Sequence, residues 1–433
     1  MARGLGLDHV VASRLTRVFP YASLHIDATA GDLLHSAANA IRHPGGDEAI
    51  LAERVERHFG GSDQAIACLS VRSCLDLYLH ANAFPKGSYV LMSAINIPDM
   101  SRVLAAHDLI PVPVDLNMDT LLPDLKQLEA LLQLEKVVAF IVAHVYGRRN
   151  PLDRIVGMTR ARGVPLIEDC AESFDGLAFR GHPGSDLVLF SFGSIKISTA
   201  FGGGVGIVRR RDVLARMRAQ HATYPVQSSS AYAQKAGKMA GVSAALNCPM
   251  ITGPGIAISN SLGYDHKAIV VQMLRGFPNA LMTGLRHQPS AALLATLDDR
   301  LRKLDYRAMA IAKLRGDQLV DSLPSGITVP GHAAATRNYW LFPVCVDESA
   351  RDGIMQRLSA MGVDASVSTT QLACIPVPDE LKGKVPEPEQ AQALMRSVIY
   401  LPVHRRVPSW AIDRLAAALA KAVNGTGSVP SRL

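Results

Sequence analysis

The chain has 433 residues, of which 48% are hydrophobic and 19% charged. This composition excludes an intrinsically disordered chain and allows a large core, with two domains expected. The formal net charge is +7, but no run of five or six basic residues occurs, so no nucleic-acid partner is expected. The six cysteines form no CxxC pair, which argues against a metal site and against a disulfide framework and favours reduced thiols in the cytoplasm.

From residue 62 to residue 210, short apolar runs alternate with segments of helical length. Strands are predicted at 65–70, 89–94, 109–115, 136–147 and 164–170, with helices at 72–84, 99–108, 122–134 and 151–163. Two more strands follow at 186–192 and 204–210. Strands that alternate with helices predict an α/β fold with a mostly parallel sheet covered by helices.

The remaining chain divides into three parts. Residues 211–285 are rich in Ala, Met, Gly, Pro and Ser and have weak periodicity, so they are interpreted as an extended insert. Residues 289–323 have a long helical pattern with proline at its start. After residue 338, a smaller α+β unit is predicted, with strands at 338–347, 363–368 and 397–403 and helices at 350–362 and 409–423.

One stretch, 239–264, carries no charged residue, which raises the question of a membrane span. Its prolines, glycines and polar residues do not fit a helix of about 20 mostly apolar residues. The stretch is therefore interpreted as buried or interfacial protein, with a peripheral membrane contact as the alternative. The N-terminus has no long apolar region, so no signal peptide is expected.

Ligands of open α/β sheets bind at the carboxyl ends of the strands, and three places qualify. Asp169 follows one strand, residues 191–196 follow another, and Arg72 with Ser73 opens a helix. Each place also has an ordinary structural interpretation as a helix cap, a surface lysine or a helix start. Together they offer a lysine able to form a Schiff base, a carboxylate for a pyridine nitrogen and a phosphate cradle, which is the chemistry of pyridoxal phosphate.

The glycines at 202–204 need a separate interpretation. A dinucleotide-binding fingerprint follows a strand and opens a helix, whereas these glycines precede the predicted strand at 204–210. A tight turn or a close approach of two backbones is therefore expected instead.

Three motifs, "LIEDCAESFDG" (166–176), "GSDLVLFSFGSIK" (184–196) and "GGGVGIVRR" (202–210), resemble those of the DegT/DnrJ/EryC1/StrS family. The likeness extends over most of the chain, including "HVYGRRNPLDRI" (144–155) and "VIYLPVHRRVPSWAIDRLAAAL" (398–419). The chain resembles a divergent member of this group of sugar-aminotransferase-like enzymes. The resemblance implies the fold-type-I pyridoxal phosphate architecture, with a large three-layer α/β/α domain and a smaller C-terminal α+β domain. The expected limits are a helical segment at 1–60, the large domain at 61–320 and the small domain at 321–433.

The resemblance also implies roles for residues at matching positions. Lys196 would form the Schiff base with the cofactor and act as the acid and base of the reaction. Asp169 would face the pyridine nitrogen. The other expected cofactor contacts are Glu172 beside the ring, Ser191, Arg72 and Ser73 at the phosphate, and Ile97 against the ring face. Tyr146 and Arg286 are candidate substrate residues, and no metal is expected.

The chain departs from the family pattern at several positions. Ile97 stands where an aromatic residue usually stacks on the cofactor, and "TAFGGG" (199–204) lacks the usual glutamate. The segment that sends an asparagine to the neighbouring subunit is not recognisable, and Arg286 is its nearest remnant. "SVSTT" (366–370) lacks the usual histidine. The motifs therefore point to the cofactor more strongly than to the substrate.

The predicted function is transfer of an amino group, from a donor such as glutamate, to a carbonyl substrate such as a nucleotide-linked keto sugar. A homodimer is expected from the resemblance. One alternative is another pyridoxal phosphate reaction, such as elimination, decarboxylation, aldol-type or substitution chemistry, on a substrate that is not a sugar. The other is a non-catalytic regulator on the same fold, against which the presence of both Lys196 and Asp169 argues.

Overall fold

The structure is a computed structural model that describes residues 19–248, 250–255, 280–367 and 370–425. Its centre is a seven-stranded sheet in the order β1-β9-β8-β7-β5-β2-β4. The strands are β1 (Ala65–Cys68), β2 (Tyr89–Ser93), β4 (Ile110–Val114), β5 (Val137–Ala143), β7 (Leu166–Asp169), β8 (Leu187–Ser191) and β9 (Gly204–Val208). The strands from β8 through β4 are parallel, while β9 runs antiparallel to both of its neighbours. The predicted mostly parallel α/β sheet is confirmed.

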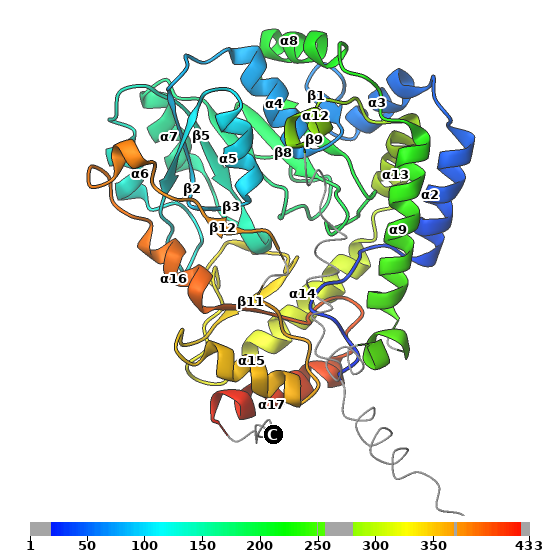
Figure 1. Cartoon of the computed structure of the whole chain (residues 1–433), viewed down its shortest axis with the longest axis vertical. Coiled ribbons are helices and arrows are strands. Elements are labelled where there is room, and N and C mark those ends of the chain that lie inside the picture. The colour runs from blue at the N-terminus through cyan, green and yellow to red at the C-terminus, as the bar shows by residue number, and fades with distance from the viewer. Residues whose placement is uncertain (1–18, 249, 256–279, 368–369, 426–433) are drawn as a thin grey trace, which may run out of the picture.

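Helices cover both faces of this sheet (Figure 1). The strands are apolar on both sides, and alternate residues of one strand enter different clusters: Leu187 and Leu189 of β8 face one layer, and Val188 and Phe190 face the other. The first layer contains α4 (Val71–Asn82), α5 (Pro98–Ala105), α8 (Arg211–His221) and α12 (Leu281–Leu285). The second contains α2 (Ala30–Arg42), α3 (Glu48–Arg57), α6 (Leu125–Leu131), α7 (Asp153–Ala161), α9 (Ser229–Asn247) and α13 (Ala291–Arg302).

The C-terminal part packs below the sheet in the view of Figure 1. It contains α14 (Tyr306–Asp321), α15 (Arg351–Ala360), α16 (Glu389–Ser397), α17 (Ser409–Val423) and the antiparallel pair β11 (Phe342–Cys345) and β13 (Val398–Leu401). Two short pairs connect it to the rest: β3 (Ile95–Asn96) with β12 (Ala373–Cys374), and β6 (Arg148–Arg149) with β10 (Thr336–Arg337). Short 3₁₀ turns occupy Val145–Gly147 and Asp379–Leu381. The domain limits expected at residues 60 and 320 stay a prediction.

Three predicted elements differ in the structure. The long helical pattern at 289–323 forms two helices. The first, α13, ends at Arg302, and Asp305 caps the start of α14 by accepting a hydrogen bond from the backbone of Ala308. The strand predicted at 338–347 is shorter, since Tyr339 adopts a positive φ of 46°. The strand predicted at 363–368 is wrong for the part described, where only an isolated bridge joins Ser366 to Tyr400.

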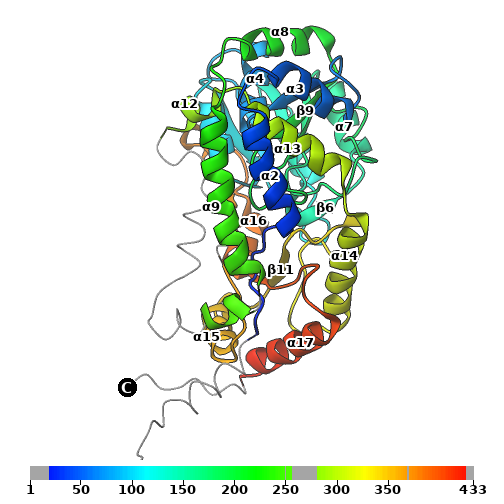
Figure 2. The ribbon, with the colours of Figure 1, turned by 90° about the vertical axis from the view of Figure 1, so that its right-hand side faces the viewer.

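The segment interpreted as an insert contributes α8 and α9 to the helical layers. Helix α9 is capped at its N-terminus by the hydroxyl of Ser228 and lies beside α2 and α13 (Figure 2). Within the part of the chain that the structure describes, no helix is both long and apolar enough to cross a membrane. Residues 256–264 of the uncharged stretch lie outside the described residues, as do residues 1–18 of the predicted N-terminal helical segment.

Candidate active site

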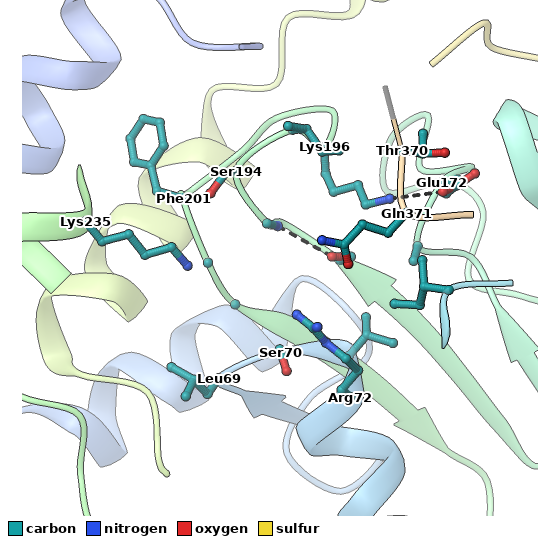
Figure 3. Close-up of a pocket in the computed structure, with 18 of the residues that line it drawn as sticks. Leu69, Ser70, Arg72, Glu172, Ser194, Lys196, Phe201, Lys235, Thr370 and Gln371 are labelled. Carbon is teal, nitrogen blue, oxygen red and sulfur yellow. Dashed lines mark hydrogen bonds and ion pairs between the residues drawn. The ribbon is translucent and has the colours of Figure 1, made fainter. Parts of the chain in front are cut away.

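A cavity of about 570 Å³ opens at the carboxyl ends of β7 and β8, beside the first turn of α4 (Figure 3). Helix α9 forms one wall, and Trp340 with residues 370–372 of the C-terminal part forms another. The position follows the rule for parallel sheets, because the loops after neighbouring strands diverge there and leave a crevice. Six of the predicted site residues line this cavity: Arg72, Ile97, Asp169, Glu172, Ser191 and Lys196.

Lys196 lies in the turn that follows β8 and is held by groups on two sides. Its Nζ is 3.4 Å from Glu172 Oε1 and 3.8 Å from the centre of the Trp340 indole ring. Burial lowers the pKa of Lys196 below the usual value for lysine, and the charges of Glu172 and Asp169 oppose this shift only in part. More of the neutral, nucleophilic amine is therefore present than in a solvated lysine.

Asp169 ends β7 and is buried. Burial raises the pKa of its carboxyl group to about 6, although the Ala171 backbone N–H donates to it at 2.9 Å and the charge of Lys196 opposes the shift. A buried carboxylate whose charge is costly gains from a cationic partner. Among the described residues, no cation forms an ion pair with it, so a cationic ligand group would find a prepared site there.

The strand that presents Asp169 is fixed by a buried network. His144 lies 3.0 Å from Glu168, and the backbone N–H of His182 and the hydroxyl of Ser185 also donate to this carboxylate. His144, Glu168 and Cys170 lie close enough to be considered as a metal site. The hydrogen bonds already occupy both oxygens of Glu168, so we interpret the group as support for β7.

The first turn of α4 forms the opposite end of the cavity. Ser70 caps the helix by accepting a hydrogen bond from the Ser73 backbone, and the first N–H groups of a helix have no partner within it. Arg72 forms an ion pair with Asp99 of α5. Gly204 of β9 packs directly on this turn, because a Cβ atom there would lie 2.5 Å from the Val71 backbone nitrogen. The glycines therefore allow a close backbone approach, in agreement with the sequence interpretation.

Three predicted residues do not line the cavity. The Ser73 hydroxyl donates to the carbonyl of Leu285 at 2.8 Å. Tyr146 is fully buried, and its hydroxyl lies 3.1 Å from that of Tyr400. Arg286 pairs with Asp76 on α4. The structure thus gives Ser73, Tyr146 and Arg286 roles in packing around the site within this chain.

Sequence reasoning missed three residues of the cavity wall. Trp340 donates from its indole nitrogen to the Ile195 carbonyl at 2.7 Å and covers Lys196. Lys235 enters from α9, and Gln371 enters from the C-terminal part (Figure 3). An isolated lysine in a weakly periodic segment and a glutamine in a loop carry no pattern that would have identified them.

Comparisons with known proteins identify the family of the chain. The model of the DegT/DnrJ/EryC1/StrS aminotransferase family matches residues 30–250 and 282–420. GDP-perosamine synthase of Caulobacter vibrioides is 24% identical over 381 residues, which are 85% of this chain and 88% of that protein. L-glutamine:scyllo-inosose aminotransferase of Streptomyces griseus is 29% identical over 164 residues, covering 37% of this chain and 38% of that one.

Solved structures have the same fold at low sequence identity. The aminotransferase TlmJ of Streptoalloteichus hindustanus superposes with a TM-score of 0.67 and 17% identity, covering 93% of this chain and 99% of its own. PseC of Helicobacter pylori, an aminotransferase involved in the biosynthesis of pseudoaminic acid, superposes with a TM-score of 0.68 and 12% identity. The superposition covers 94% of this chain and 99% of PseC.

Proposed function

Because the chain belongs to the DegT/DnrJ/EryC1/StrS aminotransferase family, we propose that it transfers an amino group to a keto sugar with pyridoxal 5′-phosphate bound in the cavity of Lys196. The observation that carries this proposal is that one cavity contains both the desolvated Lys196 and the buried carboxyl group of Asp169. The predicted aminotransferase activity and the predicted family are confirmed by the family match and its relatives.

The residues present fit the cofactor. Lys196 would hold it covalently, and Asp169 would pair with its pyridine nitrogen, which as a cation satisfies the buried carboxylate. Ser191 and the first turn of α4 lie where a phosphate would be held. Ile97 would cover the ring with an aliphatic side chain instead of an aromatic one.

When bound, pyridoxal phosphate supplies a carbonyl that condenses with amines and a ring that accepts electrons from a broken C–H bond. The residues of this chain do the rest. Lys196, with its lowered pKa, is suited to take a proton and return it at the neighbouring carbon. Glu172 and the Trp340 ring face limit where the amine can move. The indole also covers part of the cavity and so keeps water from the reacting atoms.

The substrate class is supported by the names of the relatives, which include GDP-perosamine synthase and L-glutamine:2-deoxy-scyllo-inosose aminotransferase. A cavity of about 570 Å³ is large enough for a cofactor together with part of a sugar substrate. A nucleotide-linked keto sugar as acceptor and glutamate as donor are our proposals, and the glutamine named in several relatives is the alternative donor to be tested.

The test is an absorption spectrum of the purified protein with pyridoxal phosphate, before and after addition of glutamate or glutamine. We expect the band of a lysine-bound cofactor, and its conversion by one donor to the pyridoxamine form. Lys196→Ala should lose the band, whereas Lys126→Ala, which removes a lysine outside the cavity, should retain it. A band that survives in Lys196→Ala would contradict the role of this lysine, and a spectrum that neither donor changes would contradict transamination.

We also propose that the protein is a cytoplasmic homodimer. The six cysteines are free, which supports a reducing compartment. Leu34 and Ile41 on α2 and Met250 beyond α9 are 71%, 81% and 86% exposed, which supports an interface between two copies. Sedimentation of the purified protein would measure the oligomeric state directly, and a monomer at micromolar concentration would contradict this proposal.

A further inference from the structure

Lys235 is a cation inside the cavity that the proposed reaction does not use. It lies in the second turn of α9, and its side chain points into the cavity (Figure 3). Its Nζ is 3.6 Å from the position that a Cβ atom of Gly202 would occupy. Among the described residues, none forms a hydrogen bond or an ion pair with this ammonium group. Burial, and secondly the charge of Arg72, lowers the pKa of Lys235 to about 8.

The location of Lys235 is the end of the cavity opposite Lys196. Gly203, next to Gly202, donates its backbone N–H to the Leu69 carbonyl, one residue before the cap of α4. Gly204 packs against the first turn of α4 and pairs with Ser191 in the sheet. Lys235 therefore lies on the same side as the α4 N-terminus, Arg72 and Ser191, which is the side proposed above for the phosphate.

The charges of the cavity are unevenly distributed. Its titratable lining groups are Arg72, His144, Asp169, Glu172, Lys196, Tyr232, Lys235 and Lys238. Both carboxylates belong to the Lys196 end, where Glu172 pairs with the lysine. At the α4 end, the charge of Arg72 is balanced by Asp99, while α13 contributes the apolar Leu293. No acid of the described residues pairs with Lys235, which lies on the side of the positive end of the α4 dipole.

We infer that Lys235 binds the phosphate group of pyridoxal 5′-phosphate, together with the α4 N-terminus and Arg72 of the same chain. A partly buried ammonium group that pairs with no acid of the described residues is costly, and a dianionic phosphate removes that cost. This contact accounts for a departure of the sequence from its family: the segment that would reach a neighbouring subunit's phosphate is not recognisable here, and α9 supplies a cation within the chain instead.

The inference rests on the proposed function in one respect, that the cavity binds this cofactor. Its test uses pyridoxamine 5′-phosphate and pyridoxamine, which cannot bond covalently to Lys196 and differ only in the phosphate. Equilibrium binding of both to the cofactor-free protein is measured for the wild type, Lys235→Met, Lys235→Arg and Lys126→Met. Lys126 is an exposed lysine on α6 that does not line the cavity, so its variant controls for the loss of one charge.

We expect Lys235→Met to weaken pyridoxamine 5′-phosphate binding by about 10- to 100-fold, the value of one charge-assisted hydrogen bond. Pyridoxamine binding should change less than about threefold in the same variant, and Lys126→Met should change neither. Lys235→Arg should keep most of the preference for the phosphate. If Lys235→Met weakens the binding of both ligands equally, or of neither, the inference is overturned.

The pH dependence gives an independent result. As pH rises through about 8, Lys235 loses its proton unless an anion holds it. The ratio of the two affinities should therefore fall in the wild type between about pH 7 and pH 9.5, and stay level in Lys235→Arg, because arginine remains charged.

Two further outcomes are distinguishable. If Lys235→Met spares the cofactor but weakens binding of UDP or GDP, then Lys235 contacts the substrate and the inference is overturned. If the wild type binds neither pyridoxal phosphate nor pyridoxamine phosphate, the proposed function itself fails, and this inference fails with it. If the wild type binds pyridoxamine 5′-phosphate tightly and Lys235→Met binds it with the same affinity, only the role of Lys235 is overturned.

Discussion

The two residues most important for the proposed chemistry, Lys196 and Asp169, have pKa values shifted toward their neutral forms. Burial lowers the pKa of the lysine and raises that of the aspartate. The cofactor-free protein therefore keeps charge in its cavity at a cost to stability, as is common at functional sites. A ligand that brings a pyridinium cation to Asp169 would remove part of this cost.

Replacement of Asp169 by asparagine tests this cost. The folded pKa of about 6 lies above the ordinary value of 3.8, so the folded protein binds more protons and its stability falls as pH rises from about 4 to about 6. Asp169→Asn should remove that fall. Without cofactor, it should raise the free energy of unfolding at pH 7 by about 1–3 kcal/mol, while cofactor binding and activity decrease.

Urea unfolding of the cofactor-free proteins at pH 4.5 and pH 7 measures the effect. Asp352→Asn is the matched control, since Asp352 is exposed at the start of α15. If the free energy of unfolding falls equally in the wild type and in Asp169→Asn between these two pH values, the charge of Asp169 does not destabilise the folded protein.

Among the single residues of the cavity, the sequence predicts those that follow a strand. It does not predict those that reach the cavity from other parts of the chain. Asp169, Ser191 and Lys196 follow apolar strands, and this position alone predicts a shared cavity. Trp340 covers Lys196 from 144 positions away, and Lys235 comes from a segment of weak periodicity. Their placement depends on tertiary packing, which a local pattern does not contain.

The key contact between secondary-structure elements is that of β9 with α4. Gly204 and Gly206 have no side chain because α4 lies directly against them: a Cβ atom at Gly204 would lie 2.6 Å from the Ser70 carbonyl carbon, and one at Gly206 would lie 2.2 Å from Cys74 Sγ. Glycine inside a strand is otherwise unfavourable, so these positions trade strand propensity for the close approach of α4.

Gly204→Ala should therefore displace the first turn of α4, since its new methyl group meets backbone atoms that cannot rotate away. We expect a loss of about 1–3 kcal/mol in the free energy of unfolding and weaker binding of pyridoxamine 5′-phosphate. Gly202→Ala is the control for stability, because its methyl group would have only ordinary contacts at 3.5 Å.

Denaturant unfolding and ligand titration of the two variants give the comparison. Equal stability of Gly204→Ala and Gly202→Ala would show that α4 can move at no cost, contrary to the packing described here. The position of the glycines before a strand was enough to exclude a dinucleotide loop from the sequence. The antiparallel direction of β9 could not be predicted from the sequence, because apolar runs do not reveal strand direction.

At the scale of the whole molecule, residues 19–29 connect the C-terminal part to the sheet domain. The backbone N–H of Phe19 donates a hydrogen bond to the Gly362 carbonyl, and that of Ser23 donates one to the Asp364 carboxylate. Asp27 accepts a hydrogen bond from the backbone of Ser198, in the loop after Lys196. His25 stacks on His404 with ring centres 4.3 Å apart. The sequence predicted two α/β units but not this connection, since contacts that span more than 300 residues leave no local pattern.

The His25–His404 stack makes this connection sensitive to acid. Burial, with the charges of Arg405 and Arg406, lowers the pKa of His25 to about 3, and the pKa of His404 is lowered by the same kinds of cause. The stabilisation from keeping these rings neutral is fully present above the ordinary pKa of 6.5 and is lost as pH falls toward 3. His25→Phe keeps a ring for stacking but cannot bind a proton.

At pH 7, His25→Phe should be about as stable as the wild type. At pH 4.5, it should be more stable by about 2–3 kcal/mol, the cost that the wild type then bears for a neutral His25. His80→Gln, which removes an exposed histidine of α4, should follow the wild type at both pH values. Thermal unfolding across this range would measure the difference. If the stability of His25→Phe falls with acid as steeply as that of the wild type, the His25–His404 stack is not the group that couples residues 19–29 to pH.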